Sequence, residues 1–487
     1  MSSSAIPSQF PVRAAPTRSY WEPFAAVVGV SIAVLLIFPG WLFAIVVTLV
    51  ILFASGFFPK TTLYVLVFLL PFAPYLDSGF VVREMGTIVR ILAFVGFLLG
   101  YVLRGKPIKK WLLRSQCDHL AWAVLGVAVF SMTVAHGFSH ITLRALVRLV
   151  SYVFLYFMVT AYVASCRDLW KLINSLLWST LLVALFGLYQ SVHGSFGDLP
   201  FSLSQTPDLI GQWDPRIPSF LGYSNLLAAY LNLVLPLALG AGIIELNRGR
   251  RILGFAVTSL GCVALFLTQS RGALVAFVVI LIFVLFSLEK RRNRRVTILV
   301  SILAAILVAL PMMASFSNHF ESIETESGTM RLFFWSAGLA MFTSSPLLGV
   351  GYGNFREMYS SFPGMDWISE GAYDAHNIYI QTLAETGLVG FLVFVLFIRL
   401  VMRSAFQQLW NGRDKLDRLI GLWVAAAVIG VLIHGFVDYT FQASPQFGSL
   451  FWLAIGVMVV NGRRGTTAVS GASPRGSSEG LLIRAGG

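Results

Sequence analysis

The sequence predicts an all-α polytopic membrane protein, and three observations lead to this prediction. Hydrophobic residues make up 57% of the 487 residues, charged residues only 12%, and the mean hydropathy is +0.79. A soluble domain carries charges at about a quarter of its positions, so this chain has too few to cover a water-exposed surface. Its apolar residues form continuous runs of helix-spanning length, without the alternation typical of a membrane β-barrel.

The apolar runs predict roughly 12–14 transmembrane helices, because the first runs are short and closely spaced. The candidate spans are residues 22–38, 41–58, 61–76, 88–103, 119–136, 146–165, 171–190, 223–245, 252–269, 272–288, 296–314, 377–402, 418–436 and 446–461. Backbone inside a bilayer must satisfy its hydrogen bonds internally, which requires helices here.

The net charge of +13 comes largely from short basic runs between the apolar ones. This placement is typical of positive-inside topology and argues against a nucleic-acid partner. Alternating spans put all the runs on one side, which we predict to be cytoplasmic. The basic runs are Arg104–Lys110, Arg248–Arg251, Lys290–Arg295 and Arg463–Arg464. We therefore predict a cytoplasmic tail at 1–21, a transmembrane region at 22–461 and a disordered cytoplasmic tail at 462–487.

Two long connections, 193–222 and 315–375, fall on the opposite, extracytoplasmic side. The second is acidic and rich in aromatic residues, so we expect a folded cap that contains short helices. The three cysteines and seven histidines are scattered along the chain. We therefore predict no disulfide framework, no metal site and no other cofactor.

Several arginines lie on the outer side, where the positive-inside bias disfavours them. We therefore expect them to have an anionic partner. The guanidinium fork suits phosphate, and the arginines concerned are Arg216, Arg271, Arg331 and Arg356. The alternative for each is pairing with a loop carboxylate. Arg271 lies in a tight turn at the membrane boundary, where charges are costly and often functional; its alternative is snorkelling to lipid phosphate.

His376 begins the span that follows the long loop, and an imidazole can accept a proton near neutral pH. Asn377 is a candidate helix cap, and Asp374 could orient the histidine or act as the base itself. The alternative is that His376 only caps or packs. His434 and Asp438 are one helical turn apart, and we interpret them as structural, or otherwise as lining the same cavity.

At these residues the chain resembles the O-antigen ligase/polymerase superfamily of bacterial envelope glycan enzymes. Three motifs in order carry the resemblance, with a weaker one before them. They are Thr268–Ala273, Arg331 and Trp335 followed by Pro346–Phe355, His376-Asn377 with Gly387 and Gly390, and the weaker Arg216–Phe220 with Asn225 and Ala228–Tyr230. Together they cover about residues 210–395.

The resemblance implies a GT-C-type glycosyltransferase in the bacterial inner membrane, without a metal or other cofactor. Its donor would be a glycan on undecaprenyl pyrophosphate, and its acceptor lipid A-core or a growing polysaccharide. By the same resemblance His376 is the base, and Arg271 and Arg331 bind the pyrophosphate. Arg216 lines the cavity. Asn377, Trp335, Arg356 and Asp374 complete the predicted substrate-binding set.

Two other classes of function remain open at this stage. A lipid-linked glycan flippase would carry charges along a path through the membrane, whereas the predicted spans are nearly free of charge and the polar residues gather on one face. A scaffolding protein would have no reason to keep arginines and an acidic cap outside. The sequence therefore favours the enzyme, but ligase and polymerase are not separated.

Overall fold

The computed structural model describes residues 40–72, 85–105, 112–134, 139–193, 216–288, 324–361 and 374–470. Within these ranges all regular elements are α-helices or short 3₁₀ helices. The chain divides into two units, Met1–Val50 and Ile51–Gly487. Helix α2 (Gly40–Phe57) crosses this boundary, and the other described helices belong to the second unit.

Apart from α14 (Glu324–Ser344), which lies in the predicted loop 315–375, the long helices of the second unit follow the apolar runs of the sequence. They are α3 (Pro59–Leu69), α5 (Met85–Leu103), α7 (Gln116–Val134), α8 (His140–Tyr162), α9 (Cys166–His193), α10 (Ser224–Ile244), α11 (Arg248–Leu267), α12 (Arg271–Leu288), α16 (Ile378–Asn411), α17 (Lys415–His434) and α19 (Pro445–Ser470). Within the described residues, nine helices are long and apolar enough to cross a membrane. This confirms an all-α polytopic membrane protein, although the predicted spans 22–38 and 296–314 lie outside the described residues.

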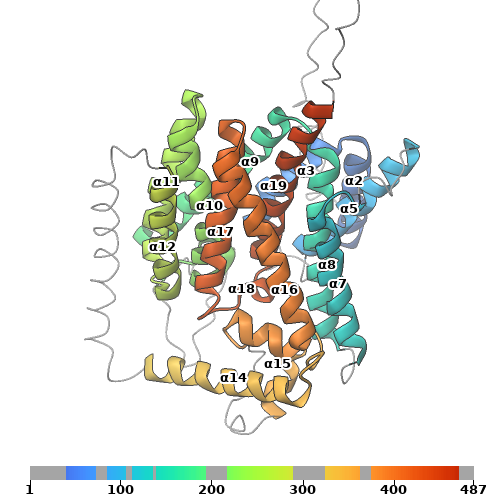
Figure 1. The fold of residues 1–487 in the computed structure, drawn as a ribbon, viewed down its shortest axis with the longest axis vertical. Helices are drawn as coiled ribbons and strands as arrows, with labels where there is room; N and C mark the ends of the chain where they lie inside the picture. Colours follow the sequence, from blue (N-terminus) through green and yellow to red (C-terminus); the bar gives the residue numbers. More distant parts are fainter. Residues whose placement is uncertain are drawn as a thin grey trace, which may run out of the picture. The chain divides into compact units, whose positions relative to one another are not determined.

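Helices α10 and α17 form the centre of the second unit (Figure 1). Helix α10 packs against α11, α12 and α17, while α17 also contacts α16 and α19. Most of α10 is buried, in keeping with a sequence that is apolar around the whole helix. The largest fully buried side chain, Trp423, donates its indole N–H to the carbonyl of Leu233 at 2.8 Å and so joins the two central helices.

The contacts between helix ends fall into two groups. Lys60 pairs with Asp168, Arg463 with Asp118, and the Arg250 guanidinium lies over the Trp170 ring. All of these residues lie in or beside segments predicted to be cytoplasmic. At the opposite ends, segments predicted to be extracytoplasmic contact the last turns of α9 and α7, as in the hydrogen bonds from the Ser219 amide to Gln190 and from the Tyr352 amide to Ser131. The predicted alternation of spans therefore agrees with the packing.

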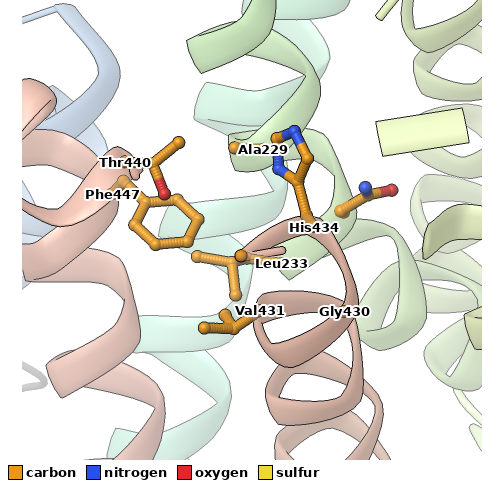
Figure 2. Close-up of a pocket in the computed structure, with 9 residues that line it drawn as sticks. Ala229, Leu233, Gly430, Val431, His434, Thr440 and Phe447 are labelled. Atoms are coloured by element: carbon orange, nitrogen blue, oxygen red, sulfur yellow. The ribbon is translucent and has the colours of Figure 1, made fainter. Parts of the chain in front are cut away.

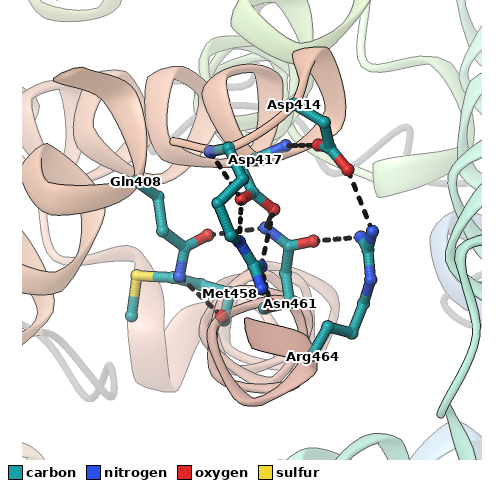
Figure 3. A network of polar contacts seen from close by, with 7 residues as sticks. Gln408, Asp414, Asp417, Met458, Asn461 and Arg464 are labelled. Carbon is teal, nitrogen blue, oxygen red and sulfur yellow. Dashed lines mark hydrogen bonds and ion pairs between the residues drawn. The ribbon is translucent and has the colours of Figure 1, made fainter. Parts of the chain in front are cut away.

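Helix α19 continues to Ser470, past residue 461 where the transmembrane region was predicted to end. A polar network around the buried Asn461 supports the first residues past this point (Figure 3). Its side-chain amide donates to Gln408 and to Asp417, both at 2.9 Å. Its side-chain oxygen accepts from Arg464, which also pairs with Asp414. These bonds hold the first residues beyond the apolar run in helical form.

We expect Asn461→Leu to lower the stability of the protein by about 2–4 kcal/mol, because it leaves Gln408 and the buried Asp417 carboxylate short of a donor. Thermal unfolding of the purified protein in detergent measures the effect. Asp414→Asn is the matched control, since it removes a half-exposed ion pair worth about 0–1 kcal/mol. Equal melting temperatures for the Asn461 variant and the wild type would contradict the assignment.

Candidate active site

The predicted cap, 315–375, contains α14, the short helix α15 (Phe355–Met358) and the 3₁₀ turn η4 (Tyr359–Ser361). Helix α14 runs across the ends of the long helices and packs against α16 (Figure 1). A hydrophobic cluster separate from the main core joins these elements. Its buried members are Phe334, Ala337, Met341, Val350, Phe355, Tyr359, Ala375 and Ala384. The described part of the loop is therefore folded onto the start of α16.

Helix α16 is broken at Gly387, and the segment that follows α14 fills the break. Gly387 has φ 60° and ψ −163°, which ends the helical hydrogen bonding locally. The amides of Val350 and Gly351 donate to the carbonyls of Ala384 and Glu385, at 2.8 and 3.0 Å. In the other direction, the amides of residues 388 and 389 donate to the carbonyls of residues 346 and 347. The open backbone groups of α16 are therefore paired, as backbone at membrane depth requires.

Two glycines of the motifs that carry the family resemblance, Gly387 and Gly349, are required by the close backbone packing at this break. A Cβ on Gly387 would overlap the backbone of Leu347, and a Cβ on Gly349 would overlap the backbone of Glu385. Both residues also have positive φ, which glycine adopts without steric cost. The two backbones can approach this closely only because neither residue has a side chain.

His376 stands just before α16 with its backbone in the left-handed region, at φ 47°. Its neighbours on both sides are anchored. The amide of Ala375 donates to Gln381 at 2.7 Å. The Asn377 side chain caps α16 by accepting from the amides of residues 379 and 380, and it donates to the Phe436 carbonyl at 3.1 Å. A strained backbone held by such contacts is common at functional sites.

The imidazole of His376 faces Asp438 on the turn after α17. His376 Nδ1 lies 3.3 Å from Asp438 Oδ1, and the histidine side chain is 36% exposed. Asp438 Oδ2 lies 4.0 Å from Nε2 of the buried His434. Burial would raise the pKa of the Asp438 carboxyl, but the His376 hydrogen bond and the two imidazoles keep that pKa below its usual range. The carboxylate is therefore ionised at neutral pH. Its contribution to the stability of the folded protein is lost only as the pH falls through this lowered pKa.

Two arginines border this group of His376, Asp438 and His434. Arg271 is the first residue of α12, and a Cβ on the next residue, Gly272, would overlap Val437 and lie 3.2 Å from the His434 ring. The start of α12 is therefore pressed against the turn that carries Asp438. Arg331, on α14, lies within electrostatic range of His434. Phe334, three residues on, has its ring centroid 6.2 Å from that of His376.

The other predicted site residues have different surroundings. Arg356 and Asp374 form a two-pronged ion pair, with Arg356 Nε 2.8 Å from Asp374 Oδ1, and this pair raises the pKa of Arg356. Their charged groups thus face each other and fix the chain two residues before His376. Trp335 Nε1 is buried and has no hydrogen-bond partner among the described residues. Arg216 starts a segment anchored to α9 through Ser219.

The sequence favoured a structural role for Asp438 and His434, with lining the same cavity as the alternative; the structure places Asp438 against His376 and His434 next to Asp438. The signal in the sequence was their spacing of four residues at the outer end of a span. It could not show that this turn lies against the start of α16. The amide of Ile378 donates to the Gly435 carbonyl at 2.8 Å, and the Tyr379 hydroxyl donates to the Leu432 carbonyl at 2.7 Å. These bonds place the two turns side by side.

The fold and the site define a polytopic membrane protein with a histidine, a carboxylate and arginines grouped at one end of its helices. A family model described as O-antigen ligase matches residues 255–395. This match confirms the resemblance to the O-antigen ligase/polymerase superfamily for the segment that carries Arg271, Arg331 and His376. It supports an activity of the O-antigen ligase/polymerase type, which is glycosyltransferase-like. No curated protein compared with the chain gives a match.

Proposed function

We propose that this protein is a membrane glycosyltransferase that moves a glycan from undecaprenyl pyrophosphate onto an acceptor hydroxyl. The acceptor is lipid A-core or a growing polysaccharide, and the reaction takes place at the extracytoplasmic face of the bacterial inner membrane. The observation that carries the proposal is the grouping of His376, Asp438 and Arg271 at one end of the bundle. The match to the O-antigen ligase model over this segment supports the same class of reaction.

His376 is the general base of the proposed reaction. Its Nδ1 faces the Asp438 carboxylate at 3.3 Å, so a neutral imidazole donates its Nδ1–H to Asp438 and leaves Nε2 free to accept a proton. The acceptor oxygen attacks the anomeric carbon as its proton passes to Nε2. The bond between this carbon and the pyrophosphate oxygen breaks on the opposite face, which inverts the configuration. Asp438 stabilises the imidazolium that forms, as an orienting carboxylate does in other catalytic sites.

Arg271 and Arg331 stabilise the negative charge that develops on the departing pyrophosphate. Guanidinium groups already in place stabilise such charge without having to reorganise during the reaction, and no step here calls for a metal. Trp335 follows Arg331 by four residues on α14, and its indole N–H, which has no partner among the described residues, is a further donor for a glycan or phosphate oxygen. Asn377 acts through the backbone of His376, and Arg216 extends the basic lining. Arg356 and Asp374, predicted as substrate-binding, fit an anchoring role through their ion pair.

Arg271→Ala should lower the rate of glycan transfer about 10²–10³-fold, since loss of one donor to a developing oxyanion costs about 2.7–4 kcal/mol of barrier. Arg271→Lys should recover part of the rate, because lysine restores the positive charge but not the two-pronged hydrogen bonding of the guanidinium group. The assay follows release of undecaprenyl pyrophosphate from a purified lipid-linked donor in proteoliposomes with acceptor present.

Arg250→Ala is the matched control, since this arginine lies near the start of α11, at the end opposite the turn with Arg271. It should transfer glycan at the wild-type rate. An Arg271→Ala variant with unchanged transfer would remove Arg271 from the mechanism. Movement of the intact donor between leaflets, with no pyrophosphate released, would identify a flippase instead.

A further inference from the structure

A small cavity lies inside the bundle, and His434 is one of the residues that line it (Figure 2). Helices α10 and α17 form most of its wall, and the short helix α18 (Thr440–Ala443) and α19 complete it. The lining residues are Ala229, Asn232, Leu233, Gly430, Val431, His434, Gly435, Thr440 and Phe447. The wall is apolar apart from Asn232, His434 and Thr440. With a volume of about 10 Å³ it has room for roughly one water molecule.

The hydrogen bonds of Asn232 indicate what kind of molecule fills this cavity. The residue is 3% exposed, and its Nδ2 donates to the Ala273 carbonyl at 2.9 Å. Its Oδ1 is buried and accepts no hydrogen bond from the described residues. A buried acceptor left unpaired costs about 1–3 kcal/mol, and buried polar groups nearly always have a protein or water partner. A water in the adjoining cavity would supply the missing donor.

His434 shares this cavity with Asn232 and is itself 5% exposed. Its Nε2 lies 4.0 Å from Asp438 Oδ2, which is longer than a hydrogen bond. The direct contact with Asp438 therefore does not by itself fix which ring nitrogen carries the proton. A hydrogen bond made on the cavity side would fix it, as the partners of buried histidines usually do. The charged groups of the described residues that act on His434 are Asp438, which also faces His376 at the start of α16, and Arg331 on α14. The first turn of α12, which begins with Arg271, packs against the His434 ring through Gly272.

We propose that one buried water fills the cavity, donates to Asn232 Oδ1 and bonds to a ring nitrogen of His434. Asn232 is then a positioning residue. Its side-chain oxygen accepts a hydrogen bond from the water, and the bond between the water and His434 fixes the tautomer of this histidine. His434 in turn sets the orientation of Asp438, and the electric field at Asp438, opposite His376. This role rests on the proposed function, whereas the water itself does not.

Asn232→Leu tests the proposal, because leucine has a similar volume and removes the amide oxygen. We expect kcat for glycan transfer to fall about tenfold with KM unchanged, at the low end of the loss found when the outer hydrogen-bond partner of a metal ligand is removed. The acidic limb of the pH–rate profile should also shift. A high-resolution cryo-EM map of the wild type should show a water within hydrogen-bond distance of Asn232 Oδ1 and the His434 ring, and the variant should lack it.

Thr180→Val is the matched control. It removes the buried hydrogen bond of 2.8 Å between Thr180 and Tyr230. Tyr230 lies on α10, like Asn232, but is not among the residues that line the cavity. It should lower stability without moving the pH–rate profile. An empty cavity in the wild-type map overturns the proposal, and so does an unchanged profile in Asn232→Leu. A wild type that releases no pyrophosphate overturns the proposed function instead, and the map still decides whether the water is present.

Discussion

His376→Asn should abolish glycan transfer while the protein keeps its normal level and fold. Loss of a general base typically costs about 10²–10⁴-fold in rate. Asparagine is a better test than alanine here. The backbone of His376 has φ 47°, a conformation that asparagine tolerates and that alanine adopts only with strain.

The rate is measured as undecaprenyl pyrophosphate released per protein in proteoliposomes, and the fold is checked by the melting temperature. His119→Asn is the matched control, since this exposed histidine lies at the other end of the bundle, where its ring nitrogen bonds to the Ser115 carbonyl in its own turn. If His376→Asn kept more than about a tenth of the wild-type rate, the base would have to be another group.

The helices themselves could be predicted from the sequence, because each depends on a local property. Every predicted span that falls within the described residues overlaps a helix. An apolar run of helix length in a chain with few charges has no other stable arrangement in a bilayer. The position of His376 could be predicted for a similar reason: Asn377 is a local capping signal, and the structure shows its side chain accepting from two amides of the first turn.

The partner of His376 could not be predicted, because it depends on a contact between residues far apart in the chain. Asp438 follows His376 by 62 positions, and its spacing with His434 is equally compatible with a structural pair. The same holds for the ion pair of Arg356 and Asp374. Both were predicted to bind substrate, with pairing to a loop carboxylate as the alternative for Arg356, and the sequence could not show that Asp374 is its partner.

The break in α16 was also hidden in the sequence. The stretch around Gly387 is apolar and has the length of a span, so it predicts an unbroken helix. A glycine inside a helix costs only about 1 kcal/mol and does not by itself predict a break. The break exists because the backbone of residues 346–351 takes over the hydrogen bonds that α16 gives up. The pairing depends on two segments whose complementarity appears only when both are folded.

Gly387→Ala should therefore destabilise the junction between the cap and α16 strongly, by about 3–5 kcal/mol. Its φ of 60° with ψ −163° lies in a region that essentially only glycine occupies. The added Cβ would also overlap the carbonyl group of Leu347, which is backbone and cannot rotate away. We expect the segment before α15 to detach from α16, so that trypsin cleaves at Arg331 or Arg356 faster and the melting temperature falls.

Gly126→Ala on α7 separates this effect from a general effect of glycine replacement. A Cβ at Gly126 meets nothing within 4 Å, so alanine there should be neutral or stabilise the helix by about 0.5–1 kcal/mol. Gly349→Ala probes the same interface from the opposite side. Once either substitution has detached the segment the other has little left to disrupt, so the double variant should lose far less stability than the sum of the two. Fully additive losses would show that the two glycines act independently, and that the paired backbones are not one structural unit.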